Sequence, residues 1–167
     1  PLGRQPLRFP YQRLLLRQQL EGNLGVVVVA INANAALGKI GGVFLATQSR
    51  HATGATHLEL VRGFGEPSLS VLDNAAKELR EEAGLVASRC VAIGSILPDT
   101  GMSHARVEVV VAYVEGRTAS EPEMGEATGP ILLLNEADLC EAIGDGRIQD
   151  AMTIAAVARY LWSRAVS

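Results

Sequence analysis

The stretch "AAKELREEAGL", residues 75–85, places Glu78, Glu81 and Glu82 close together near the end of a predicted helix. Carboxylates at i and i+4 repel each other, and negative charge in the last turn opposes the helix dipole. A divalent cation removes both penalties, because Mg²⁺ prefers oxygen ligands and commonly takes one or two carboxylates together with substrate phosphates. The pattern therefore indicates a metal site. A solvated helix face, supported by an ion pair between Lys77 and Glu81, is the alternative interpretation.

Signals on both sides of this stretch define the helix. Ser70, followed three residues later by Asp73, matches a capping box at the start, and Gly84 is a typical left-handed stop. The predicted buried face is an apolar stripe with helical spacing, and the acids lie roughly opposite to it. This stripe consists of Leu72, Ala76, Leu79 and Ala83.

Strands are expected before and after the helix. The β-branched run "GVVVVAINA", residues 25–33, predicts a strand that is buried on both faces. Further strands are predicted at 41–50, 56–63, 90–97 and 105–116. The segment 129–139 is predicted to be a strand that runs into a short helix, and an amphipathic helix follows at 148–165. This order predicts an α/β sandwich on a mixed β-sheet.

Composition limits the class of protein. A chain of 167 residues with 48% hydrophobic and 20% charged residues suits one globular domain, and a net charge of -3 argues against general nucleic-acid binding. The apolar run "LGVVVVAI" is too short for a membrane span, and no signal-peptide core follows the arginines near the start. We therefore expect a cytoplasmic protein. Because the chain begins with Pro1, we expect it to be part of a longer one.

The acids and their neighbours resemble the signature of the Nudix hydrolases, G-x5-E-x7-R-E-U-x-E-E-x-G-U, in which U is a bulky apolar residue. Gly63 matches the first glycine, and the half from Glu78 to Leu85 matches without a gap. Two positions depart, because Leu69 replaces the first glutamate and Lys77 replaces the arginine. Those two family residues can form an ion pair that braces the loop against the helix. We expect this brace to be missing and the metal-binding half to be intact.

The resemblance extends to the ADP-ribose pyrophosphatase branch of the family and covers residues 24–162. The segment "LATQSRHATGATHLELVRGFGEP" resembles the lead-in to the signature in that branch, and "GRIQDAMTIAAVARY" resembles its closing helix. A proline that the branch carries after the signature is Thr100 here, with Pro98 nearby.

This resemblance implies a Nudix-like α/β/α sandwich at residues 24–167, preceded by a lead-in at 1–23 that contributes to a homodimer. It also implies a hydrolase that requires Mg²⁺, or Mn²⁺, and cleaves a nucleoside diphosphate linked to another moiety. The expected substrate is ADP-ribose or an ADP-sugar, and the products are a nucleoside monophosphate and a phosphorylated compound. The alternative is a nucleotide-binding or sensor module with little or no catalytic activity.

The resemblance also implies the metal ligands. They are the carboxylates of Glu78, Glu81 and Glu82 and the backbone carbonyl of Arg62. Glu81 and Glu82 take part in catalysis with the metal, which acts as a Lewis acid and lowers the pKa of the attacking water.

Three further residues are candidates for the same site. Glu126, with Glu123 as a competitor, is expected as a loop acid that aids metal binding or acts as a base. Arg50 resembles an arginine that pairs with substrate phosphate, a task that suits its bidentate fork. Glu59 resembles an acid that faces the substrate. Ordinary surface or edge-strand roles remain the alternatives for all of them.

Overall fold

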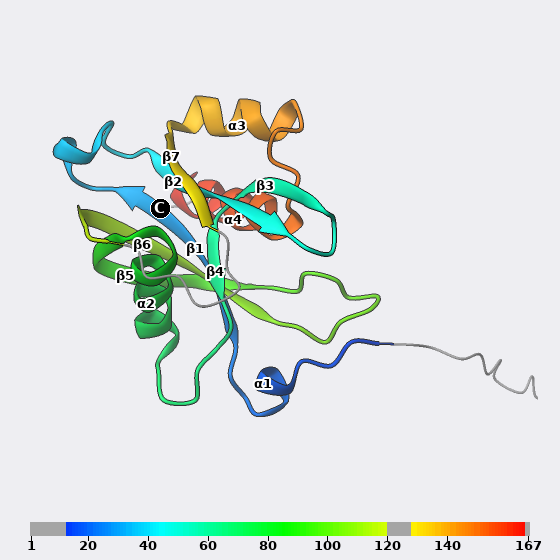
Figure 1. Ribbon diagram of the computed structural model, residues 1–167. Coiled ribbons are helices and arrows are strands. Elements are labelled where there is room, and N and C mark those ends of the chain that lie inside the picture. The colour runs from blue at the N-terminus through cyan, green and yellow to red at the C-terminus, as the bar shows by residue number, and fades with distance from the viewer. Residues whose placement is uncertain (1–12, 120–127, 166–167) are drawn as a thin grey trace, which may run out of the picture.

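The computed structural model describes residues 13–119 and 128–165 (Figure 1). Its first half contains α1 (Arg17–Leu20), β1 (Gly25–Asn32), a 3-10 turn (Ala35–Leu37), β2 (Val43–Arg50), β3 (Ala55–Glu59) and β4 (Val61–Gly63). Its second half contains α2 (Val71–Ala83), β5 (Leu85–Ile96), β6 (Val107–Arg117), β7 (Thr128–Leu134), α3 (Glu136–Gly144) and α4 (Ala151–Ala165). No helix in these ranges is both long and apolar enough to cross a membrane.

The strands form one mixed sheet of seven strands with β1 at its centre. On one side, β1 runs parallel to β6, which pairs in turn with β5. On the other side, the first part of β1 pairs with β4 and its last part pairs with β2, both antiparallel. The outer strands β3 and β7 both pair with β2.

Helices cover both faces of the sheet, with α2 on one face and α3 and α4 on the other (Figure 1). Every residue of β1 is buried, and its side chains alternate between the two layers. Val28 packs in the same cluster as Leu79 of α2, whereas Val27 packs in the cluster that contains Val157 of α4. The predicted α/β/α sandwich, with a central strand buried on both faces, is confirmed.

The helix α2 has the predicted ends. Ser70 caps it by accepting a hydrogen bond from the backbone N–H of Asp73 at 3.1 Å, and Gly84 ends it with φ at 61°. The predicted buried stripe is partly wrong, because Leu72 is 38% exposed. The helix is rotated so that one edge of its acidic face also lies against the sheet. Its buried residues are Asn74, Ala75, Glu78, Leu79, Glu82 and Ala83.

Two strand predictions differ from the structure. The strand expected at 56–63 is divided at Leu60, where the chain leaves β2 as its partner and joins β1. The backbone N–H of Leu60 donates instead to the hydroxyl of Thr153 in α4, at 3.0 Å. The strand expected at 90–97 begins directly after Gly84, as β5.

The described part of the lead-in lies against the loop between β5 and β6. The backbone N–H of Leu14 donates to the carbonyl of Met102 at 2.6 Å, and the side-chain oxygen of Gln19 accepts from the N–H of Arg106 at 2.6 Å. These contacts fix α1 beside the start of β1 and the end of β4.

Candidate active site

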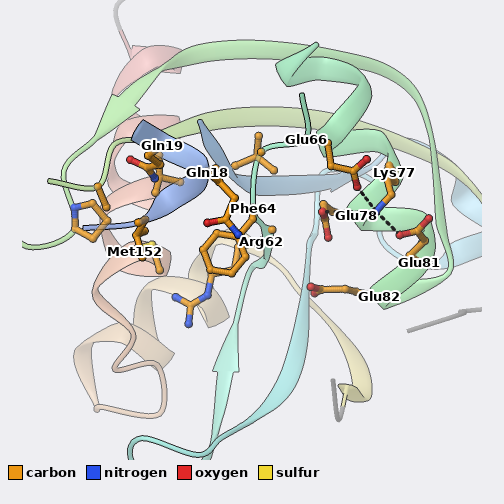
Figure 2. Close-up of a pocket in the computed structure, with 18 of the residues that line it drawn as sticks. Gln18, Gln19, Arg62, Phe64, Glu66, Lys77, Glu78, Glu81, Glu82 and Met152 are labelled. Carbon is orange, nitrogen blue, oxygen red and sulfur yellow. Dashed lines mark ion pairs between the residues drawn. The ribbon is translucent and has the colours of Figure 1, made fainter. Parts of the chain in front are cut away.

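A cavity of about 690 Å³ opens where α1, β4, α2 and the start of α4 meet. Figure 2 shows that its two sides differ in chemistry. The side formed by α2 and the preceding loop carries charged residues, namely Glu66, Lys77, Glu78, Glu81 and Glu82. The other side carries amide and apolar groups from three separate segments, including Gln18, Gln19, Phe64 and Met152.

Glu78 is positioned by close packing on the end of β4. Its side chain lies against Gly63, so that a Cβ built on this glycine would lie 2.0 Å from Cδ of Glu78 and 2.2 Å from its Oε1. Any larger residue at position 63 must therefore displace the carboxylate. The glycine of the predicted signature has a direct physical role, which is to leave space for a metal-ligand candidate.

Glu82 lies one turn further along α2 and is only 5% exposed. The side-chain amide of Gln48, which is itself buried on β2, donates to its Oε2 at 3.1 Å. Gln48 could not be identified from the sequence, because nothing in its local sequence separates it from any other polar strand residue. Its amide holds the carboxylate at the cavity wall while leaving it accessible to the cavity.

A brace between loop and helix is present, although the sequence predicted its loss. The ammonium of Lys77 lies 2.8 Å from a carboxylate oxygen of Glu66 in the loop and 2.6 Å from one of Glu81. Hydrogen bonds to Glu66 and then to Glu81 raise the pKa of Lys77, so it stays charged. Glu66 thus replaces the family glutamate that Leu69 lacks. The sequence feature that could have indicated this ion pair is Glu66 itself, in "GFGEP", three residues before the expected position of the glutamate.

We expect this brace to stabilise the fold modestly. In a double-mutant cycle of Glu66→Gln and Lys77→Met, the coupling free energy should be about 0.5–1 kcal/mol, because the pair is only partly shielded from water. Urea unfolding of the metal-free protein measures it. The more exposed pair Arg164–Glu136, with a separation of 2.7 Å, serves as the comparison and should show a smaller coupling. Zero coupling for the first pair would mean that Lys77 does not join loop to helix.

The acidic side of the cavity fits a hard divalent cation whose remaining coordination positions are filled by other ligands. Glu78 and Glu82 lie one helical turn apart on the buried edge of α2, while Lys77 holds Glu81. Within residues 13–119 and 128–165, no three His, Cys, Asp or Glu side chains form a ready metal site. Mg²⁺ suits such an arrangement, because it usually keeps several waters and binds only one or two carboxylates plus substrate phosphates.

The residue that carries the predicted carbonyl ligand is next in sequence to a glycine that contacts one of these acids. Arg62 directly precedes Gly63, on which the Glu78 carboxylate packs, so its backbone carbonyl remains a candidate. The two predicted loop acids, Glu123 and Glu126, lie outside the described residues, and their roles stay predictions.

The structure places Arg50 at the cavity wall, whereas Glu59, which was expected to face the substrate, is not part of that wall. Glu59 is 2% exposed and binds Nη2 of Arg50 at 2.6 Å and Nη2 of Arg62 at 3.0 Å. Burial alone would lower the pKa of Arg50, but the hydrogen bond and charge of Glu59, with the charges of Glu82 and Asp150, raise it. Glu59 therefore orients arginines in this structure and does not itself form part of the cavity wall.

Comparison with known proteins agrees with this architecture. A family model described as the NUDIX domain matches residues 23–159, and no curated protein matches the chain. Among solved structures, the crystal structure of an ADP compounds hydrolase is similar, with a TM-score of 0.72 and 18% sequence identity over 87% of this chain and 75% of that one. This likeness concerns the fold, whereas the family match spans most of the sequence. The chain therefore belongs to the Nudix hydrolase family.

Proposed function

We propose that the protein is a Mg²⁺-dependent pyrophosphohydrolase that cleaves a nucleoside diphosphate linked to another moiety, with ADP-ribose or an ADP-sugar as the substrate. One observation carries the proposal: Glu78 and Glu82 meet at the wall of a cavity that also contains Arg50. Carboxylates for a cation and an arginine for phosphate oxygens are the groups that a diphosphate requires. The similarity to an ADP compounds hydrolase supports this choice of substrate.

In this proposal the described residues have separate tasks. Glu78 and Glu82 hold the cation, and Lys77 keeps Glu81 beside them. Arg50 donates to a phosphate oxygen. Mg²⁺, or Mn²⁺ in its place, supplies a Lewis acid when it is bound and lowers the pKa of the attacking water. The amide and apolar side of the cavity takes the nucleoside or sugar, with Phe64 as a flat apolar surface.

A panel of diphosphate compounds tests the proposal. It should include ADP-ribose, ADP-sugars and nucleoside triphosphates, and release of nucleoside monophosphate is measured with Mg²⁺ and with excess EDTA. We expect Mg²⁺-dependent release from ADP-ribose or an ADP-sugar. Release from none of these linked diphosphates would contradict the proposal. Tight binding of one of them without turnover would establish the sensor alternative.

We also propose a homodimer and a cytoplasmic location. The segment before β1 exposes Leu14 and Leu20, and Met102 is exposed in the loop to which Leu14 binds. Exposed apolar side chains of this kind suit contact with a second protein surface. Light scattering at micromolar concentration should give twice the mass of the chain. A fully active monomer would contradict the dimer.

A further inference from the structure

Two arginines on different strands share one buried carboxylate. Arg50 ends β2 and binds Glu59 through Nε, at 3.2 and 3.1 Å, and through Nη2, at 2.6 Å. Arg62 lies in β4 and binds the same carboxylate through Nη2, at 3.0 Å. A charge as deeply buried as that of Glu59 is costly unless it is paired, so both arginines are tied to this position.

A second acid fixes Arg62 from another direction. Nη1 of Arg62 donates to Asp150 at 3.0 Å. The other carboxylate oxygen of Asp150 accepts from both the backbone N–H and the hydroxyl of Thr153, each at 2.8 Å. Asp150 is therefore anchored to the first turn of α4, and the guanidinium of Arg62 is held at two of its nitrogens. An arginine held in this way loses little conformational entropy when it binds a ligand.

The network presents its two arginines to the cavity and keeps its two acids off the cavity wall; Glu59 is buried and Asp150 is partly buried. Arg50 and Arg62 both line the cavity, whereas Glu59 and Asp150 do not. A guanidinium carries five N–H donors, so each arginine keeps donors beyond those that the acids use. Figure 2 shows the side chain of Arg62 on the side of the cavity away from Glu78 and Glu81.

We propose that the guanidinium of Arg62 is a second phosphate-binding group, which acts with Arg50 as a two-arginine clamp, and that Glu59 and Asp150 are its positioning residues. The inference rests on the proposed function in that the ligand is a diphosphate. The four glutamates on the opposite side of the cavity outnumber Lys77, so without a bound cation that side repels such an anion. The clamp offsets this repulsion and orients the phosphate oxygens by directed hydrogen bonds.

Calorimetric titration with inorganic pyrophosphate, in Mg²⁺ and again in EDTA, tests the clamp without relying on turnover. We expect Arg62→Ala to weaken binding about tenfold in whichever buffer the wild type binds, because a charge-assisted hydrogen bond is lost. The pyrophosphate affinity of Arg62→Lys should lie between those of the wild type and Arg62→Ala. An ammonium keeps the charge but cannot span both Glu59 and Asp150. Arg147→Ala removes the same charge from an exposed pair with Asp145 and should bind like the wild type.

The Arg62 variants should fold, because each acid keeps another partner: Glu59 keeps Arg50, and Asp150 keeps Thr153. Circular dichroism checks this, and kinetics with the best linked diphosphate should show a higher KM with a smaller change in kcat. Unchanged pyrophosphate affinity in Arg62→Ala, or no binding to the wild type in either buffer, would overturn the clamp. Arginine-dependent binding of pyrophosphate by a protein that hydrolyses no linked diphosphate would refute the proposed function and leave the clamp standing.

Discussion

Replacing Glu82 with glutamine is expected to lower kcat at least about 100-fold, because it removes a charged ligand from the proposed metal site. The side chain keeps its shape, so the fold should persist. Without metal, the variant should be as stable as the wild type or slightly more stable, since the change relieves repulsion between Glu82 and Glu78 one turn away. Steady-state kinetics over a range of Mg²⁺ and thermal unfolding in EDTA measure the two effects.

A matched control is Glu141→Gln, which neutralises an exposed acid of α3 that pairs with Arg147 at 3.5 Å. It should leave kcat unchanged. Near-normal turnover of Glu82→Gln at saturating Mg²⁺ would remove Glu82 from the set of ligands. A large loss of stability without metal would instead give Glu82 a structural role, with its hydrogen bond from Gln48 as the cause.

Gly63→Ala should be nearly as damaging to activity, although it adds only one methyl group. Its Cβ would lie 2.0 Å from Cδ of Glu78, far inside van der Waals contact. Because the obstacle is the end of a side chain, Glu78 can rotate away and the protein can fold. The carboxylate then leaves its place beside Glu82. A displacement of this size at a reacting site costs about 100-fold in turnover.

Kinetics and Mg²⁺ titration monitored by calorimetry measure this effect, which should weaken metal binding and lower kcat together. Gly144→Ala provides the comparison, because a Cβ at that position meets nothing within 4 Å. Its activity should match the wild type. Normal metal affinity in Gly63→Ala would show that Glu78 need not pack on this glycine to bind the cation.

The parts of the fold that local sequence determines were predictable. The N-cap and the left-handed stop of α2 are the residues directly before and after the helix. The burial of β1 is predicted by its run of β-branched side chains. The exposure of Leu72 was not predictable in the same way. It depends on how α2 is rotated against the sheet, in an orientation that also brings Glu78 into close contact with Gly63.

The site was predictable where its residues are adjacent in sequence, and not where distant segments meet. The signature located Gly63 and Glu78, but the amide that holds Glu82 comes from β2. A match to the signature indicates that the brace is lost, because Leu69 stands where the family has a glutamate. In the structure, the ammonium of Lys77 instead reaches another acid of the same loop. Ion pairs tolerate such exchanges, because long side chains can meet from several backbone positions.

The break at Leu60 makes the length of the segment from Glu59 to Gly63 as important as its composition. Along an unbroken strand, residues three apart face opposite sides, yet Glu59 and Arg62 form an ion pair at 3.0 Å. Inserting or deleting one residue here would turn Arg62 toward the α2 layer and carry Gly63 away from Glu78. We therefore expect diverging descendants of this chain to keep the number of residues from Glu59 to Gly63 unchanged, and to exchange side chains in this segment at Leu60 and Val61.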